Sequence, residues 1–388
     1  MQSERVEPEM ALILACCRWP PSPEREAAVH AATADVDWDR VLVLARRHRV
    51  QGLVHHALVA AAVTPDGDVS GHLQEEARAI AKRNLQLAAA SVSLVRKLEA
   101  AGVPVMVIKG TALAALAYGT LATKMAWDID LLITPDALDA AADVLEEGGY
   151  RCTLPGGARA DLATWHRFSK ESVWKRGDVH VELHDALVDS PAVLPGINAR
   201  GAAQRVAVSP GMTLPTLERD ALFAYLCVHG AASGWRRAKW LADVGALLSE
   251  ADVAEVERLH EASQVLGAGR AAGQALLLAH RFLAVPVPDA LLSRLRRDWG
   301  TRLMTRMAAR MLTAADGFDD PRDTAAGTMP IHLMQMMILP GWRFVGGELR
   351  RKAAPDPRLG PMSRVRRVLY PAAALVRRLS RAPQPGGA

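Results

Sequence analysis

Three acidic residues in the middle of the chain have the spacing of a metal site. Asp128 and Asp130 alternate with apolar residues in Asp128–Ile133. Because side chains along a β-strand alternate between its two faces, both carboxylates would lie on one face. Glu182, in the apolar segment Val179–Leu183, can supply a third carboxylate from a neighbouring strand. Converging carboxylates hold the two Mg²⁺ ions of phosphoryl-transfer sites, so the pattern predicts a magnesium site, with manganese as the alternative ion.

A turn upstream of these acids has the character of a phosphate site. Lys109-Gly110-Thr111 follows a short apolar run rich in β-branched residues and precedes a helical segment. Glycine lets a backbone approach a ligand closely, and the free amides at a helix N-terminus favour an anion. Thr111 can add a hydroxyl and Lys109 a positive charge. A solvated turn lysine is the simpler alternative for Lys109.

Two histidines near Glu182 allow a different interpretation. His180, Glu182 and His184 alternate along one predicted strand and would share a face. Such residues can bind zinc, but a structural zinc site takes four ligands and no fourth ligand lies at a nearby spacing. We therefore favour a supporting role for His184, in which it orients Glu182.

The hydrophobic pattern around these motifs predicts where they are held. Residues 10–62 and 72–101 have helical periodicity, and a helical pattern returns from Thr216 onward. Between them, residues 103–108, 128–133, 168–174 and 179–183 have the length and composition of strands. We predict a helical region at 1–101, an α/β core at 102–200, a second helical region at 201–340 and a basic Pro/Arg-rich tail at 341–388.

Composition and charge exclude several classes of protein. Half of the 388 residues are hydrophobic, which is enough for a large core. The four cysteines form no metal-binding pair, which fits a cytoplasmic protein. No basic segment precedes the apolar residues near the N-terminus, so a secretory signal peptide is not predicted. The sequence contains no run of roughly 18 uncharged apolar residues, so no transmembrane helix is predicted.

The positive charge of the chain is concentrated at its C-terminal end. The net charge is +5, but residues from Arg343 onward hold 11 Lys or Arg and two acids, so the rest is net acidic. An acidic body argues against a nucleic-acid partner. Within the tail, the charged stretch Arg364–Arg381 flanks the apolar segment Val368–Val376. This arrangement suits an anionic surface or partner, and a solvated tail is the simpler alternative.

The motifs occur in an order that resembles a known fold. A strand, a glycine turn and a helix are followed by Asp-x-Asp between apolar residues and then by an acid between apolar residues. This order resembles the nucleotidyltransferase fold of the DNA polymerase beta superfamily. A bacterial family of uncharacterised nucleotidyltransferases is similar in more detail, through Ile108-Lys-Gly-Thr-Ala-Leu-Ala114, Tyr118-Gly119, Lys124-Met-x-x-Asp-Ile-Asp-Leu-Leu-Ile133, Glu182-Leu-His184, Leu226-Cys-Val-His-Gly230 and Trp235-Arg-Arg-Ala-Lys-Trp-Leu-Ala-Asp243.

The resemblance implies a fold and a reaction. The fold would be α+β, with a small nucleotidyltransferase α/β core built on a mixed sheet and flanked by N-terminal and C-terminal helical regions. The enzyme would move a nucleoside monophosphate from an NTP, with ATP expected, to a hydroxyl of an acceptor. The acceptor stays open between a protein or peptide and a small molecule. The alternative is a non-catalytic nucleotide-binding or regulatory module that keeps the fold.

The resemblance also assigns roles to residues. The catalytic and metal-binding residues would be Asp128, Asp130 and Glu182. The nucleotide-binding residues would be Lys109, Gly110, Thr111, Lys124, His184, His229 and Lys239. The chain has Gly110-Thr111 where the superfamily usually has Gly-Ser, which keeps the hydroxyl, and Lys124 where the family often has Arg, which loses a two-pronged phosphate donor.

Two interpretations remain open for the downstream motif. His229, Arg236, Lys239 and Asp243 either form a polar network that holds the C-terminal helices to the core, or place Lys239 and His229 in the nucleotide cleft. Lys239 and Asp243 are four residues apart on a helix. An exposed ion pair at this spacing stabilises a helix by only about 0.3 kcal/mol. Trp235 and Trp240 are expected to pack rather than to stack on a base.

Overall fold

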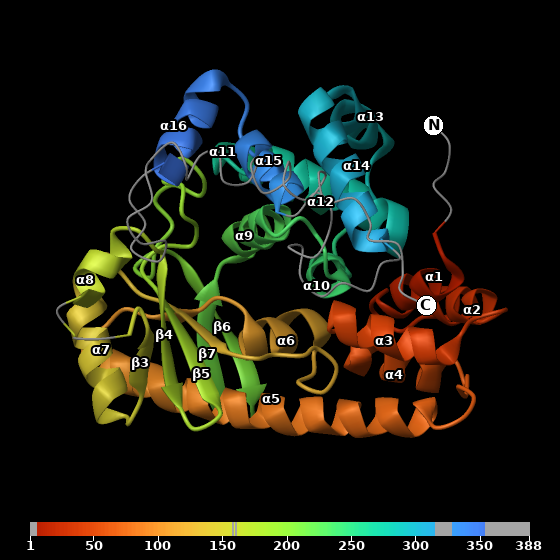
Figure 1. Cartoon of the computed structure of the whole chain (residues 1–388), viewed down its shortest axis with the longest axis horizontal. Helices are drawn as coiled ribbons and strands as arrows, with labels where there is room; N and C mark the ends of the chain where they lie inside the picture. Colours follow the sequence, from red (N-terminus) through yellow and green to blue (C-terminus); the bar gives the residue numbers. More distant parts are fainter. Residues whose placement is uncertain (1–5, 157–158, 160, 315–327, 354–388) are drawn as a thin grey trace, which may run out of the picture.

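The computed structural model describes residues 6–156, 159, 161–314 and 328–353. Its chain forms an α+β fold in which a mixed sheet lies between two groups of helices (Figure 1). The predicted fold class is confirmed.

The N-terminal helices follow the predicted periodicity closely. Four short helices, α1 (Pro8–Cys16), α2 (Pro23–Ala32), α3 (Trp38–His48) and α4 (Gln51–Ala60), precede the long α5 (Val69–Ala100). Ser22 and Asp37 cap α2 and α3 by accepting a backbone N–H with their side chains. In Figure 1, α5 runs beneath both the N-terminal helices and the sheet, so one helix joins the two parts.

The five-stranded sheet has the order β1-β2-β5-β4-β3. Its strands are β1 (Met106–Val107), β2 (Ile129–Leu132), β3 (Arg151–Leu154), β4 (Glu171–Arg176) and β5 (Val179–His184). Strands β2 and β5 are parallel, whereas the other neighbours are antiparallel. The predicted strand at 103–108 shortens to two residues, and the strand at 168–174 begins only at Glu171. The connections carry η1 (Pro135–Ala137), α6 (Gly110–Tyr118), α7 (Leu138–Glu147) and α8 (Asp161–His166).

A second, two-stranded sheet is absent from the sequence prediction. Strands β6 (Ala203–Ser209) and β7 (Met212–Leu217) form a hairpin at the start of the segment that we assigned to the C-terminal helical region. The hairpin packs on β1 and on α6. Residues 203–217 therefore extend the α/β unit beyond residue 200 in secondary structure, whereas the helices follow from Arg219.

The remaining helices form a layer over the sheet and beside the N-terminal group (Figure 1). They are α9 (Arg219–Ala232), α10 (Ala238–Leu247), α11 (Val253–Val265), α12 (Gly269–Leu283), α13 (Asp289–Arg297), α14 (Trp299–Thr313), α15 (Met329–Met337) and α16 (Trp342–Ala353). The last of these lies in the predicted basic tail, so the tail begins with a helix. The stretch Arg364–Arg381 lies outside the described residues.

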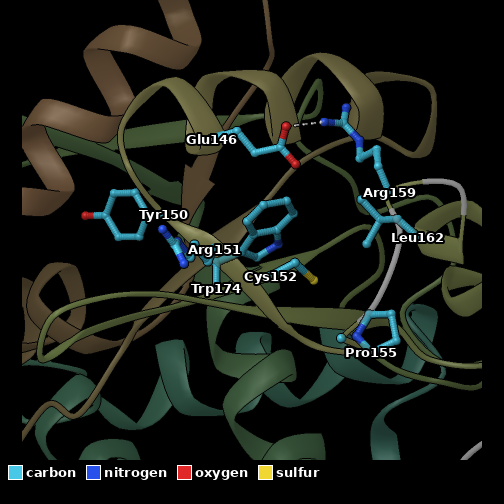
Figure 2. A pocket seen from close by; sticks show the side chains of 9 residues that line it. Glu146, Tyr150, Arg151, Cys152, Pro155, Arg159, Leu162 and Trp174 are labelled. Atoms are coloured by element: carbon cyan, nitrogen blue, oxygen red, sulfur yellow. Dashed lines mark ion pairs between the residues drawn. The ribbon is translucent and has the colours of Figure 1, made fainter.

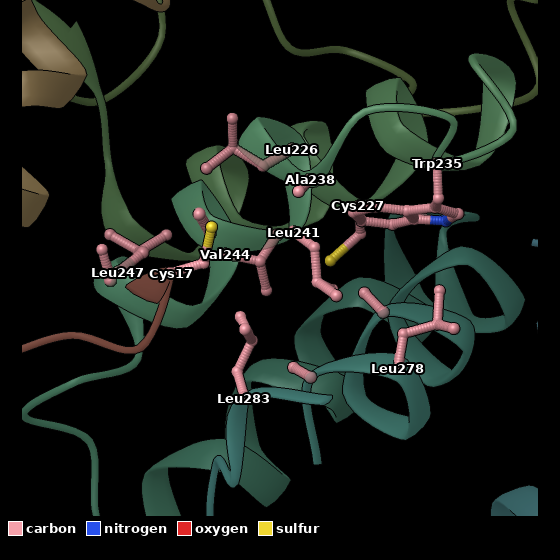
Figure 3. Packing of buried hydrophobic residues seen from close by; sticks show 14 of the residues in the cluster. Cys17, Leu226, Cys227, Trp235, Ala238, Leu241, Val244, Leu247, Leu278 and Leu283 are labelled. Atoms are coloured by element: carbon pink, nitrogen blue, oxygen red, sulfur yellow. The ribbon is translucent and has the colours of Figure 1, made fainter. Parts of the chain in front are cut away.

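Two hydrophobic clusters hold the fold together. The larger joins α1–α4 with α9–α15, and Figure 3 shows Cys17, from the end of α1, beside Val244 and Leu247 of α10. Cys16, Cys17 and Cys227 are buried, as core thiols should be, and burial raises the pKa of Cys16 to about 12. The smaller cluster joins α5, α7 and the sheet. Because α5 contributes Val69 and Leu73 to the larger cluster and Leu87–Leu98 to the smaller one, it packs with both the N-terminal helices and the sheet.

Within the described ranges, no helix combines the length and the apolar character that a membrane crossing requires.

Candidate functional site

Strand register brings the predicted acids together. In the parallel pair β2–β5, Asp130 lies opposite Glu182 and Leu132 lies opposite His184. Strand β4 then places Glu171 opposite His184 on the other side. The side chains of Asp130 and Glu182 therefore occupy neighbouring positions, as the alternation along both strands predicts.

Three residues of this group can bind one ion. Asp130, Glu182 and His184 each offer a ligand atom within 4.8 Å of the other two. Asp128 precedes β2 and is not part of this group, but its charge reaches the same place. Burial, followed by the carboxylates of Asp130 and Glu182, raises the pKa of Asp128 to about 6. Asp128 therefore lies within electrostatic range of Asp130 and Glu182.

Two basic side chains contact Asp130 directly. Lys109 Nζ lies 2.7 Å from Asp130 Oδ1, and His184 Nε2 lies 3.3 Å from the same oxygen and 3.5 Å from Glu182 Oε2. Burial alone would raise the pKa of Asp130, but Lys109 and His184 outweigh it and hold that pKa well below its usual value. Burial and Lys170 would lower the pKa of His184, and hydrogen bonds to the two carboxylates raise it.

The structure adds two residues that sequence reasoning missed. Glu171 Oε2 lies 3.3 Å from His184 Nδ1, and Lys170 forms an ion pair with Glu171. Lys170 Nζ also lies 3.3 Å from His184 Nδ1. His184 therefore sits between Glu171 on one side and Asp130 with Glu182 on the other. No local spacing signals this contact, because only the β4–β5 register creates it.

The predicted phosphate turn lies against the acidic strand. Helix α6 begins at Gly110 itself, two residues earlier than predicted, and Gly110 has φ +61. A Cβ added there would lie 3.3 Å from the carbonyl oxygen of Asp128. Both the backbone conformation and this close approach require glycine. Thr111 is buried in the first turn of the helix, beside Lys109 and its partner Asp130.

Lys124 has a different partner from the one expected of a phosphate ligand. Its Nζ lies 3.4 Å from Asp243 Oδ2, and both side chains are buried. Tyr118 Oη donates to Asp243 Oδ1 at 3.0 Å. Asp243 of α10 thus holds both the end of α6 and the loop that leads to Asp128. For Asp243, these two contacts support the interpretation that the downstream motif forms a polar network that holds the C-terminal helices to the core.

Lys239 and His229 lie on the side of the site formed by α9 and α10. Burial and the charges of neighbouring cations, Lys124 first, lower the pKa of Lys239 to about 7. Burial and the charges of Lys109, Lys170 and Lys239 lower the pKa of His229 well below its usual value. The His229 ring packs edge-on against Trp240, with centroids 5.7 Å apart. Trp235 is fully buried in the core, as expected of a packing residue.

A buried amide holds the loop before Asp128. Asn84 of α5 donates from Nδ2 to the carbonyl oxygens of Leu121 and Lys124, both at 2.6 Å. Its Oδ1 accepts from the backbone N–H of Ala126 at 3.1 Å. The side chain is completely buried, so these bonds are shielded from water. The long helix therefore fixes the path of the chain two residues before the first predicted catalytic acid.

The larger hollows of the surface lie elsewhere. Figure 2 shows a pocket of about 370 Å³ beside β3, lined by Tyr150, Cys152 and Trp174. It lies at the sheet edge opposite to β1, and Arg159 on its wall is already paired with Asp143 and Glu146. A smaller cavity of about 90 Å³ has Lys170, Tyr225 and His229 in its wall and therefore adjoins the acidic group.

The donor atoms of the acidic group fit a divalent cation. Carboxylate oxygens are the ligands that Mg²⁺ and Mn²⁺ prefer. The carboxylates of Asp130 and Glu182 help to raise the pKa of Asp128, so all three acids are within electrostatic range of one another. Within the described part of the chain, His180 is not part of the group, so a zinc site through His180 gains no support. Asp130, Glu182 and His184 are therefore the residues that could hold such an ion, with Asp128 in electrostatic range.

Comparison with known proteins places the chain in a family. No curated protein matches it. The family model described as "uncharacterised nucleotidyltransferase" matches residues 34–284, which is well over half of the chain. The match contains the acidic group, the Gly110 turn and the helices α9 and α10. The chain therefore belongs to the uncharacterised nucleotidyltransferase family.

Proposed function

We propose that this protein is a magnesium-dependent nucleotidyltransferase with the fold of the DNA polymerase beta superfamily. It transfers a nucleoside monophosphate, with ATP as the expected donor, to a hydroxyl of a protein, peptide or small molecule. The observation that carries the proposal is the pairing of Asp130 with Glu182 across β2 and β5, with Asp128 in electrostatic range. Family membership independently supports nucleotidyl transfer as the reaction.

The metal would be held by Asp128, Asp130 and Glu182, with His184 next to them. When bound, Mg²⁺ neutralises phosphate charge and lowers the pKa of the attacking oxygen. Lys109 and His184 both contact Asp130 in the structure. We propose that Lys109 exchanges part of its contact with Asp130 for a phosphate oxygen when nucleotide binds.

The residues of the chain can account for each part of the transfer. The acceptor oxygen forms a bond to the α-phosphorus, the bond between that phosphorus and pyrophosphate breaks, and the hydroxyl proton passes to the Glu182 carboxylate. The Glu182 side chain is 26% exposed, so a substrate can reach it, whereas Asp130 is almost fully buried. This difference supports Glu182 as the base and Asp130 as a fixed ligand.

The nucleotide would lie along the N-terminus of α6. The backbone amides at Gly110 and Thr111 can hold phosphate oxygens there. Lys239 provides a further cation, and among the described residues no ion pair joins it to a carboxylate. Lys124 is occupied by Asp243, which favours positioning of the loop over direct phosphate contact. His184 and His229 flank the same space. Their contacts with a nucleotide stay a prediction.

The alternative is a binding or regulatory module without catalysis. Retention of all three carboxylates argues against it. A module would bind Mg²⁺–NTP and would leave every acceptor unchanged.

The proposal is tested by mass spectrometry. The full chain is incubated with Mg²⁺, each NTP in turn and a panel of peptides and hydroxylated metabolites. We expect one acceptor class to gain the mass of a nucleoside monophosphate, with release of pyrophosphate. The Asp130→Asn variant should give no product, since loss of a metal-binding charge commonly reduces turnover on the order of 10³-fold. Nucleotide binding without product for any acceptor would favour the module.

A further inference from the structure

A tryptophan with a largely exposed side chain lies next to the predicted catalytic acids. Trp127 immediately precedes Asp128 and is 53% exposed, whereas its other neighbour, Ala126, is buried. Single exposed apolar residues are common on protein surfaces, so the surroundings of Trp127 decide whether it has a role. Three features bear on this: the contacts that hold its backbone, the turn at Gly110, and the basic side chains near its ring.

Two consecutive residues of α5 hold the backbone at Trp127. Asn84 Oδ1 accepts from the backbone N–H of Ala126 at 3.1 Å, and Arg83 Nη2 donates to the carbonyl oxygen of Trp127 at 3.3 Å. The indole therefore projects from a segment whose backbone is fixed on both sides of the Cα atom. A side chain that is positioned before binding loses less conformational entropy when a ligand packs on it, which suits a binding role.

The same segment contacts the turn at which we place the phosphates. A Cβ added to Gly110 would lie 3.3 Å from the carbonyl oxygen of Asp128 and 4.0 Å from the Cβ of Ala126. Trp127 is the residue between these two, so it lies beside the N-terminus of α6. In a nucleotide, a single ribose joins the base to the phosphates. A ring that stacks on the base must therefore lie near the phosphate site, as Trp127 does.

Arg49 connects the indole to the α10 side of the site. Its guanidinium carbon lies 5.4 Å from the centroid of the Trp127 ring, within the range of a cation–π contact. The preceding residue, His48, accepts through Nδ1 from the backbone N–H of the first residue of α10 at 3.0 Å. The charge of Arg49 influences Lys239, and the charge of Lys239 influences Asp128. Trp127, Arg49 and Lys239 thus belong to one neighbourhood around the first acid.

The flat indole selects which part of a nucleotide reaches it. The base is the planar aromatic part of an NTP, and bases stack on aromatic side chains through their π-faces. A purine has two fused rings, as indole has, and therefore covers more of the indole surface than a single pyrimidine ring does. Stacking on Trp127 would consequently favour a purine nucleotide.

We infer that Trp127 stacks on the base of the donor nucleotide, with Arg49 positioning the indole, and that the donor is a purine nucleoside triphosphate. This inference rests on the proposed function, because it assigns the base of the nucleotide whose phosphates lie at the N-terminus of α6. It also gives the N-terminal helices a part in nucleotide binding, since Arg49 follows α3.

The test compares Mg²⁺–ATP with magnesium tripolyphosphate, which has the phosphates but no base. Calorimetric titration of the full chain measures both affinities. Trp127→Ala should weaken binding of Mg²⁺–ATP about tenfold and leave that of tripolyphosphate unchanged, because only the base loses its stacking partner. The matched control is Trp299→Ala on α14. Trp299 is 59% exposed and has the guanidinium carbon of Arg270 5.6 Å from its ring centroid, and its loss should change neither affinity.

Two further comparisons separate stacking from a general loss of apolar surface. Trp127→Phe keeps an aromatic ring and should retain most of the affinity for Mg²⁺–ATP, whereas Trp127→Leu should bind as weakly as Trp127→Ala. The wild type should bind ATP and GTP more tightly than CTP and UTP, and Trp127→Ala should reduce this preference.

The outcomes distinguish this inference from the proposed function. Equal affinity of the wild type and Trp127→Ala for Mg²⁺–ATP would overturn the inference, as would a preference of the wild type for CTP or UTP. Equal weakening of ATP and tripolyphosphate would also overturn it, because the variant would then have disturbed the phosphate site. A wild type that binds neither ligand would count against the proposed function itself.

Discussion

The two neighbouring aspartates have opposite electrostatic surroundings. Asp130 contacts Lys109 and His184, which hold its pKa well below the usual value. Asp128 has no such direct cation among the described ion pairs, and burial together with the other carboxylates raises its pKa to about 6. The pair therefore divides into one carboxylate whose charge is stabilised by Lys109 and His184 and one whose charge is disfavoured by burial and by the neighbouring acids.

This division predicts opposite stability effects for two isosteric variants. Asp128 has a folded-state pKa above its ordinary 3.8, so its charge destabilises the fold fully above about pH 6, and this penalty disappears as the pH falls below 3.8. Asp128→Asn should raise the free energy of unfolding at pH 8 by on the order of 1–3 kcal/mol, and not at pH 4. Asp130→Asn should lower it by about 3 kcal/mol at pH 8, because the largely buried Lys109 ammonium group loses its ion-pair partner.

Urea denaturation without metal measures both changes. Thr111→Ala in the same site serves as a variant without a charge change and should show no comparable dependence on pH. If Asp128→Asn destabilised the protein at pH 8 as strongly as Asp130→Asn, the assignment of different surroundings to the two acids would be wrong.

Lys239 predicts proton uptake on nucleotide binding. Its folded-state pKa of about 7 lies below the ordinary 10.5, so its charge costs stability below pH 7, and the cost is lost as the pH rises from 7 to 10.5. A bound triphosphate would raise this pKa. Calorimetry of Mg²⁺–ATP binding at pH 8, in two buffers of different ionisation enthalpy, should show uptake approaching one proton.

The control for this prediction is a lysine far from the site. Lys239→Met should abolish the uptake and weaken binding, whereas Lys97→Met, on the exposed face of α5, should change neither. Identical apparent enthalpies in both buffers for the wild type would contradict a nucleotide role for Lys239.

At the residue scale, the sequence indicates candidate ligands but not their neighbours. Asp128, Asp130 and Glu182 are visible because acids in apolar strands are unusual and their alternation fixes a face. Glu171 is not visible, because its contact with His184 depends on the register of β4 against β5. Asn84 is likewise hidden, because an asparagine within a long helical pattern gives no sign that its amide reaches another segment.

At the scale of elements, α5 acts on the site through the amide of Asn84. Asn84→Ala would leave two buried carbonyl groups and one N–H without partners, so the free energy of unfolding should fall by about 2–4 kcal/mol. Because the loop positions Asp128, Mn²⁺ affinity should fall as well. Thermal melts and Mn²⁺ titrations measure the two effects.

Ser91 provides the matched control on the same helix. It is also buried, but its hydroxyl donates only to the Leu87 carbonyl oxygen within α5. Ser91→Ala should therefore leave Mn²⁺ affinity unchanged and cost less than about 1 kcal/mol. If Asn84→Ala lowered stability without changing Mn²⁺ affinity, the hydrogen bonds of Asn84 would not position the site.

Physical reasons explain why some elements could not be predicted from the sequence. Strand β7 contains Pro215, and a proline inside an apolar run argues against a strand. It is tolerated because β6 and β7 form a two-stranded sheet, in which each strand has an unpaired edge. The long α5 was predictable, since its apolar positions repeat over many turns.

At the scale of the whole molecule, the hydrophobic clusters cross the predicted regions. Leu98 of α5 is fully buried in the sheet cluster, whereas Leu53 of α4 is buried in the larger helical cluster. Leu98→Ala and Leu53→Ala should each lower the free energy of unfolding by about 2–5 kcal/mol. Hydrogen exchange should rise in β2 and β5 for Leu98→Ala and in α1–α3 for Leu53→Ala. The reverse pattern would place α5 with the N-terminal helices.

The central claim is that the acids on β2 and β5 form a metal site for a nucleotide. Its most direct test is the titration of the full chain with Mn²⁺ in the presence of ATP, followed by the electron paramagnetic resonance signal of free Mn²⁺. We predict that Glu182→Gln weakens Mn²⁺ binding about tenfold or more, because it removes an anionic oxygen ligand. Glu147→Gln, at an exposed position on α7, should bind as the wild type does. Equal Mn²⁺ affinity in the wild type and Glu182→Gln would contradict the claim.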